Sequence, residues 1–307
     1  MDPPRPFMDG PWRLAMGLRA LDPADWLDRS PDALAQIPVR RDLLRRRRDD
    51  VVAATPGSLP AQAEATGRIV AHLRHRFPDQ IVVAADGALV ERASGRRFEP
   101  RRHEDVPLAL AGALVAEDLC LMEAADDGYR LTAGVLCFPL HWSLRDKLDR
   151  ALGAIHAPVP GFGARLGGPA ARFFESLHAA RPVWRVNWSL VDTPEPFLPP
   201  AHRGSATAFD PERPAATLWF RTERQSLLRL PETAAVLFTI RTRIEPLSRV
   251  LEASGAASAL AARLREMPEP MARYKGILPI RAALLAYLDE RSSNGGGSMP
   301  SGLSATG

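Results

Sequence analysis

The sequence predicts a mixed α+β protein in which an antiparallel sheet is flanked by helices and followed by a helical C-terminal extension. Two patterns lead to this prediction. Short segments of alternating apolar and polar residues are separated by turn sequences such as Asp86-Gly87, which is typical of hairpins. Longer segments repeat their apolar residues at helical spacing, and these dominate after residue 246.

The first 59 residues are rich in proline and are expected to wrap the domain irregularly, with one helix at residues 38–53. The helix contains a basic run at residues 41–50, for which a nucleic-acid patch is one interpretation. We favour a solvated helix face, because aspartates at 42, 49 and 50 offset the arginines and no aromatic residue is interleaved to stack on bases. No nucleic-acid partner is therefore predicted.

The core is expected between residues 60 and 247. Its predicted strands are residues 81–85, 89–92, 118–123, 129–138, 184–191, 217–225 and 234–242. Its predicted helices are residues 61–76, 107–116 and 170–180, with a further helix that begins at Ser143. A long loop at residues 193–215 precedes the last two strands, since proline and polar residues dominate there. C-terminal helices at 246–254, 256–266 and 278–291 are expected to pack on the core from about residue 248, before a disordered tail at 292–307.

The helix that begins at Ser143 leads to the first candidate functional residue, His156. Ser143 has the residue type of a helix cap, and Pro158 forces the helix to end at Ala157. Four apolar residues would line one inward face of this helix: Leu144, Leu148, Leu152 and Ile155. His156 lies at the edge of that face, either as a buried histidine that caps the helix or as a metal ligand directed toward the core.

The composition is that of a globular protein, with 46% hydrophobic residues, 25% charged residues and a net charge of +4 over 307 residues. The two cysteines have neither CxxC nor CxxCH spacing, which excludes a disulfide scaffold and covalent c-type haem attachment. Apolar runs stay shorter than the roughly 18–20 residues that span a bilayer, and the N-terminal residues lack the apolar segment of a signal peptide. We expect a cytoplasmic protein without a membrane partner.

The second candidate site is the cluster RTERQ, at residues 221–225 of a predicted strand. Alternation along a strand places Arg221, Glu223 and Gln225 on one face and Arg224 on the other. Arginines beside Glu223 favour its charged form. A pocket that binds a ligand and a structural ion-pair network at a sheet edge both fit this pattern.

Three phrases, IHAPVPG at 155–161, WRVNWSLVD at 184–192 and FRTERQSLLRLPETAAVLFTIRT at 220–242, resemble the haem-dependent oxidative N-demethylase-like family of bacteria, over about residues 60–289. The resemblance implies a PAS-like core that binds haem b, with His156 as the axial iron ligand and His141 as the next choice. It implies roles in the reaction for Glu223 and Arg224. The residues implied to hold the haem propionates are Arg185, Arg221 and Arg241, and those implied to contact the substrate are Asn187 and Asp192.

By the same resemblance, the chain would oxidise a small methylated amine with dioxygen and release formaldehyde and the demethylated amine. The glycines of residues 161–168 follow a proline loop and not a strand, so they fail the context of a dinucleotide fingerprint. Electrons would therefore come from a flavin-containing reductase subunit or partner. The alternative is a non-catalytic, haem-binding, PAS-like sensor or subunit that uses the same pocket.

Overall fold

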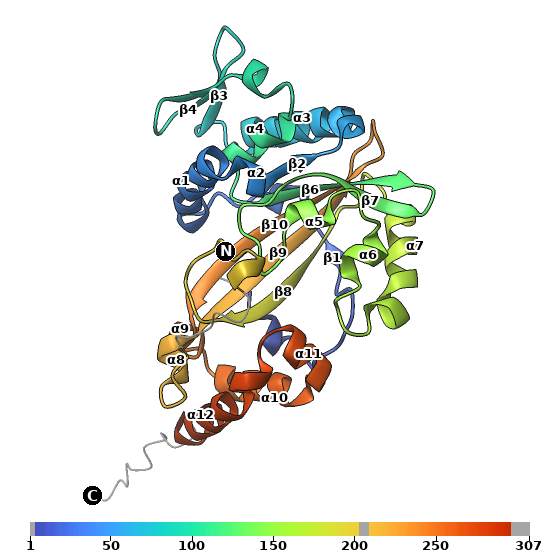
Figure 1. Cartoon of the computed structure of the whole chain (residues 1–307). Helices are drawn as coiled ribbons and strands as arrows, with labels where there is room; N and C mark the ends of the chain where they lie inside the picture. Colours follow the sequence, from blue (N-terminus) through green and yellow to red (C-terminus); the bar gives the residue numbers. More distant parts are fainter. Residues whose placement is uncertain (1–3, 203–208, 296–307) are drawn as a thin grey trace, which may run out of the picture.

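The computed structural model describes residues 4–202 and 209–295 of the chain. Its centre is an antiparallel sheet with the strand order β1-β8-β9-β10-β6-β7-β2 (Figure 1). These strands are β1 Arg19–Ala20, β2 Val52–Ala54, β6 Asp118–Ala125, β7 Gly128–Val135, β8 Val183–Val191, β9 Trp219–Arg229 and β10 Val236–Pro246. A smaller sheet consists of β3 Ile81–Val83, β4 Leu89–Glu91 and β5 Arg96–Phe98. The mixed α+β architecture is confirmed, although the short strands β1, β2 and β5 were not predicted.

The five central strands come from two separate parts of the chain. β6 and β7 form a hairpin, in which Gly128 has a φ of 108° that glycine adopts readily. After a helical segment, β8, β9 and β10 follow as an antiparallel meander. β10 then pairs with β6, so the first and last of these strands lie side by side in the middle of the sheet.

One face of the sheet, which we call the first face, carries Leu119, Leu121 and Leu237 in the largest apolar cluster. The helices α1 Pro31–Arg46, α3 Leu59–Arg76 and α4 Pro107–Leu114 contribute to this core on the same side (Figure 1). The apolar residues of α3 recur at helical spacing, with Ile69 and Leu73 fully buried.

The opposite or second face is covered over part of its area by α5 Leu144–Lys147, α6 Leu152–His156 and α7 Gly168–Ser176. Leu144 and Phe174 pack there with Met122 and Leu227 of the sheet. A Cβ at Gly134 would lie 2.7 Å from Cδ1 of Leu144, so the glycine allows α5 to approach the sheet this closely.

The C-terminal helices form a separate apolar cluster against one end of the sheet, which confirms the predicted helical extension. They are α9 Leu247–Val250, α10 Ala256–Glu266, α11 Glu269–Tyr274 and α12 Arg281–Gly295, next to α8 Pro214–Thr217 (Figure 1). Trp188 and Phe220 of the sheet and Phe7 of the N-terminal segment complete this cluster. The helix α11 was not predicted, because two prolines flank or interrupt its short sequence.

The predicted helix at residues 38–53 is wrong in its bounds. α1 begins at Pro31, where the Ser30 hydroxyl accepts a hydrogen bond from the Ala33 N–H, and it continues through Pro38. The helix α2 Arg48–Val51 follows, and the chain then enters β2. A serine cap followed by a proline in the first turn is a strong start signal, and here it outweighs the internal proline.

The continuous helix predicted from Ser143 to Ala157 is also wrong. The Ser143 cap forms as predicted, but α5 ends at Lys147 and Asp149 adopts a φ of 57°. Ala151 instead forms an isolated bridge with Arg130 of β7. The interruption separates α6 from α5, so no single helix face exists, although Leu144, Leu152 and Ile155 still pack in the same apolar cluster.

Residues 292–295 of the predicted tail belong to α12, while residues 296–307 lie outside the described residues, as do residues 203–208 of the long predicted loop. None of the helices described here has the length and apolar character needed to cross a membrane.

Candidate functional site

A polar cluster lies on the second face of the sheet, on β8 and β9. In the ladder between these strands, Asn187 lies opposite Glu223 and Arg185 lies opposite Gln225. Directly opposed residues of an antiparallel pair share a face, so these four side chains project to the same side. Arg221 shares that face, two residues before Glu223.

The Glu223 carboxylate is held by hydrogen bonds from two sides. Its Oε1 accepts from Nε of Arg221 at 3.2 Å. Its Oε2 accepts from Nε2 of Gln225 at 3.2 Å and from Nδ2 of Asn187 at 3.5 Å. A carboxylate has about four acceptor positions, so these three donors leave capacity for one further donor. Glu223 is therefore fixed in place yet still able to bind a ligand.

Arg221 anchors this arrangement to two loops. Its side chain is 1% exposed, and its terminal nitrogens donate to the carbonyl oxygens of Phe138 at 2.6 Å and Pro196 at 3.1 Å. A fourth donor reaches the Thr242 hydroxyl at 3.5 Å. Most of the five guanidinium donors are thus used inside the protein, so Arg221 is better suited to orient Glu223 than to hold a ligand.

Lys275, directly after α11, fixes the Asn187 amide. Its Nζ donates to Oδ1 of Asn187 at 3.1 Å and to the Trp188 carbonyl oxygen at 2.6 Å. An ammonium group has donors only, so the amide must turn its oxygen toward Lys275. The amide NH2 group consequently faces Glu223. Lys275 thus acts as a positioning residue for the carboxylate.

Replacing Lys275 by methionine, a side chain of similar length without charge, is expected to change the pH dependence of stability. Burial is the largest influence on the pKa of Lys275 and lowers it to about 8. The charge of Glu223 raises this pKa, whereas the charge of Arg185 lowers it further. In an unfolded chain, lysine has a pKa of about 10.4. At a pH between these two pKa values, the unfolded chain binds more protons than the folded chain does. The contribution of Lys275 to the unfolding free energy therefore increases as the pH rises.

The unfolding free energy of the wild type minus that of Lys275→Met should therefore increase by about 1–3 kcal/mol between about pH 8 and pH 10. Urea denaturation at several pH values measures this difference. Lys147→Met removes the other lysine of the chain and serves as the matched control, with a smaller expected change. Parallel stability curves for the wild type and Lys275→Met would contradict the assignment.

His156 ends α6 with a defined ring orientation. Its Nδ1 lies 2.9 Å from the carbonyl oxygen of Leu152, which can only accept, so Nδ1 carries the hydrogen and Nε2 is unprotonated in the neutral ring. The ring stacks on Phe162 with centroids 4.5 Å apart. Burial is the main cause that lowers the pKa of His156, and the charges of Lys147 and Arg185 lower this pKa further. The hydrogen bond to Leu152 raises it in part. A neutral imidazole with a free Nε2 is the form that binds iron.

Cationic groups outnumber carboxylates around Glu223. Burial lowers the pKa of Lys147 and of Arg185, and the charge of Glu223 raises both. The Nε of Arg185 is buried without a hydrogen-bond partner among the described residues. Since the single carboxylate of Glu223 is shared by Arg221, Arg185 and the two lysines, the cluster favours an anionic ligand.

The remaining predicted site residues do not join this cluster. Arg224 and Arg241 are paired across the ladder on the first face of the sheet. Arg241 forms ion pairs with Asp28 at 2.9 Å and Asp32 at 2.6 Å, and Arg224 donates to the Trp26 carbonyl oxygen at 3.1 Å. These contacts fasten the N-terminal segment to the sheet.

Asp192 and His141 also lie apart from the Glu223 hydrogen bonds. Asp192 directly follows β8, and within the described part of the chain no hydrogen bond joins it to Glu223. His141 lies in the loop after β7 with a φ of 58°, and its N–H donates to the Leu198 carbonyl oxygen at 2.7 Å.

The prediction from sequence missed Lys147, Lys275 and Phe162. A signal for the lysines exists, because Lys147 and Lys275 are the only two lysines among 40 basic residues. Both interact electrostatically with Glu223. A lysine presents a compact ammonium, which suits the two contacts that Lys275 makes with Asn187 and Trp188.

A groove of about 630 Å³ borders the elements that carry His156 and Lys275. It is lined by Pro158, Pro160, Glu269, Pro270, Arg273 and Tyr274, that is, by the loop after α6 and by α11. A bare metal ion is not favoured nearby, since the described residues contain no group of three or more His, Cys, Asp and Glu side chains that could hold one. Haem needs fewer protein ligands, so this finding leaves a haem site open.

Comparison with family models gives a match over most of the chain. The model described as haem-dependent oxidative N-demethylase, alpha subunit-like, matches residues 17–285. The matched range contains His156, Glu223, Lys275 and all five central strands of the sheet.

Proposed function

The chain belongs to the haem-dependent oxidative N-demethylase, alpha subunit-like family, and on this premise we propose that it uses haem b and dioxygen to demethylate a small methylated amine. The products would be formaldehyde and the demethylated amine. The observation that carries the proposal is a neutral histidine with a free Nε2, beside a cluster with more cations than carboxylates.

His156 is the residue that would bind the haem iron. The carbonyl oxygen of Leu152 fixes its tautomer, and the stack on Phe162 fixes the ring plane. Both constraints orient Nε2 before a ligand arrives, as in other metal-bound histidines. When bound, haem supplies the electron transfer to dioxygen.

Arg185 and Lys147 are the proposed partners of the haem propionates. Their positive charges are only partly compensated by Glu223, and the buried Nε of Arg185 has no hydrogen-bond partner in the described residues. A carboxylate there would form charge-assisted hydrogen bonds and relieve the cost of burying the cations. The sequence-based assignment to Arg221 and Arg241 has less support, since both are occupied by protein groups.

Glu223 is the proposed contact for the amine nitrogen. A protonated amine must lose its proton before its nitrogen can give up electrons, and a fixed carboxylate can hold the ammonium and accept that proton. The methylated amine then loses two electrons and one methyl proton to form an iminium. Addition of water to the iminium carbon and cleavage of the C–N bond yield formaldehyde and the demethylated amine.

The arrangement of the sheet supports the PAS-like core that the resemblance implies. A hairpin, a helical segment and a three-stranded meander follow in sequence, with the first and last strands adjacent at the centre. The helical segment between them carries His156, so the cofactor would lie between that segment and the second face.

An electron donor is part of the proposal. The amine gives up two electrons, whereas reduction of dioxygen to water takes four, so a reductase must supply the difference. A flavin-containing subunit or partner would fill this role, and the family's description as an alpha subunit supports a multi-subunit enzyme.

Two measurements test the proposal. Titration of the purified protein with haemin should produce a Soret band, because an imidazole nitrogen is free to bind iron. With a reductant and oxygen, a panel of small methylated amines should then include one that releases formaldehyde. Glu223→Gln has the same shape and is expected to keep the Soret band while turnover falls at least about 100-fold, in the range for loss of an acid–base group.

The results of these measurements distinguish a demethylase from a haem-binding sensor and from a protein that binds no haem. A folded protein without a Soret band would contradict haem binding. Haem binding without formaldehyde from any amine would favour the alternative, a haem-binding sensor or subunit. Equal turnover in Glu223→Gln and the wild type would remove Glu223 from the mechanism.

A further inference from the structure

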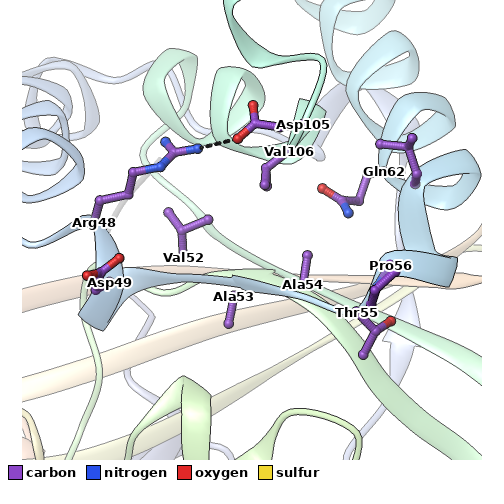
Figure 2. A pocket seen from close by; sticks show the side chains of 11 residues that line it. Arg48, Asp49, Val52, Ala53, Ala54, Thr55, Pro56, Gln62, Asp105 and Val106 are labelled. Atoms are coloured by element: carbon purple, nitrogen blue, oxygen red, sulfur yellow. Dashed lines mark hydrogen bonds and ion pairs between the residues drawn. The ribbon is translucent and has the colours of Figure 1, made fainter.

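A second cavity lies at the opposite edge of the sheet, beside β2. Its volume is about 280 Å³, and β2 forms one wall while α2, α3 and the segment before α4 form the others (Figure 2). The lining combines apolar side chains, such as Val52 and Val106, with the Gln62 amide. In the strand order, β2 and β8 stand near opposite ends of the sheet, so this cavity is independent of the Glu223 cluster.

The Gln62 amide oxygen is a buried acceptor without a partner. Gln62 is 1% exposed, and its Nε2 donates to the Ser58 hydroxyl oxygen at 2.9 Å. Ser58 uses its own hydrogen to donate to the Thr55 carbonyl oxygen at 2.7 Å, so it can only accept from Gln62. This fixes the amide orientation and leaves Oε1 without a hydrogen bond among the described residues. Figure 2 shows this oxygen directed into the cavity.

The edge of β2 adds free backbone groups next to the cavity. The Leu136 N–H donates to the Val51 carbonyl oxygen, and the Thr55 N–H donates to the Thr132 carbonyl oxygen. Odd-numbered residues of this segment therefore bond to β7. The intervening Ala54 directs its N–H and C=O away from β7, toward the edge of the sheet.

These edge groups lack partners within the described residues. The Val52 N–H is used by the Arg48 carbonyl oxygen at the end of α2, but the Val52 C=O also points outward. Three backbone groups, from Val52 and Ala54, are thus available to a further strand. The ion pair of Arg48 and Asp105, at 3.4 Å, forms the rim of the cavity above them (Figure 2).

We propose that β2 is a docking edge for an extended segment of a partner protein, which pairs with Ala54 and inserts one hydrogen-bonding side chain into the Gln62 cavity. A residue opposite Ala54 exchanges two backbone hydrogen bonds with it, and its side chain points to the same face as that of Ala54. That face holds the cavity (Figure 2). Backbone pairing together with a side-chain pocket is how sheet edges recognise peptides.

The free acceptor sets the chemistry of the inserted residue. It must donate to Oε1 of Gln62. It is also expected to be uncharged, because Val52, Ala54 and Val106 surround that oxygen, whereas the charged lining residues Arg48, Asp49 and Asp105 have exposed side chains. An asparagine, glutamine, serine or threonine meets both conditions. A small molecule would use the cavity but leave the edge groups of Ala54 unpaired, so the geometry favours a peptide. The family's description as a subunit is consistent with a protein partner.

The test uses two capped pentapeptides, Thr-Val-Asn-Val-Thr and Thr-Val-Leu-Val-Thr, titrated to millimolar concentration into the isotopically labelled full chain. NMR should show shifts of the Ala54 backbone amide and the Gln62 side-chain amide. The asparagine peptide should bind about five-fold more tightly than the leucine peptide, as one neutral hydrogen bond provides.

Two variants sharpen the result. Gln62→Met keeps the length of the side chain and should abolish the preference for asparagine. Ala54→Pro removes an N–H that makes no hydrogen bond in the described residues, so it should leave the fold intact and prevent binding of both peptides. An unchanged preference in Gln62→Met would overturn the proposal, as would shifts with acetamide but with neither peptide.

Discussion

Replacing His156 by alanine is expected to abolish the Soret band or shift it to that of haem without a protein imidazole. His156 is the one histidine in the described residues with Nδ1 bonded to a helix carbonyl and a ring stacked on an aromatic side chain beside the Glu223 cluster. Mutation of a residue that hydrogen-bonds to a metal ligand already lowers metal affinity by about 10–100-fold. Loss of the ligand itself should therefore weaken haem binding by at least about 100-fold. Haemin titration followed by absorbance measures both effects.

Matched variants separate ligation from damage to the fold. His141→Ala, at the alternative histidine, should bind haem as the wild type does. His156→Gly leaves space for a free imidazole, so added imidazole should restore the absorbance spectrum. An unchanged spectrum in His156→Ala would place the iron ligand on another residue.

The sequence predicted the central strands and the position of His156 well, for a physical reason. The alternation in β8 is strong, because Trp184, Val186, Trp188 and Leu190 recur at every second position. In β9, the two-residue period of a strand alone places Glu223 and Arg221 on the same face. α6 ends at His156, close to Pro158 as the sequence predicts, but Ala157 keeps α-helical dihedrals of φ −51° and ψ −36°, so Pro158 does not push it out of the helical region. Both predictions depend on neighbours in the sequence.

What the sequence did not predict depends on distant contacts. Lys275 reaches Asn187 across 88 positions, through a short helix without a clear pattern. Arg241 was assigned to the cofactor, but it pairs with Asp28 and Asp32, which no local rule connects to β10. Charge alone does not distinguish an arginine that binds a ligand from one that fastens a segment.

Replacing Asp118 by alanine is expected to destabilise the fold more than any change on the protein surface. Asp118 is fully buried, and its Oδ1 accepts from a terminal nitrogen of the equally buried Arg40 at 2.5 Å. It also accepts from the N–H groups of Cys137 at 2.6 Å and Phe138 at 3.1 Å. Removal of one partner from a buried ion pair leaves an uncompensated charge, which costs about 3–5 kcal/mol.

The same network supports the candidate site, because the carbonyl oxygen of Phe138 accepts from Arg221, which in turn holds Glu223. Urea denaturation of Asp118→Ala should therefore show the large loss of stability, and haem titration should show a weaker or heterogeneous site. Arg40→Met combined with Asp118→Ala removes both charges of the pair and should recover part of the lost stability, limited by the two unpaired N–H groups. A loss below about 1 kcal/mol in the single variant would mean that water or a local rearrangement compensates Arg40, and that this ion pair does not hold α1, β6 and the Phe138 loop together.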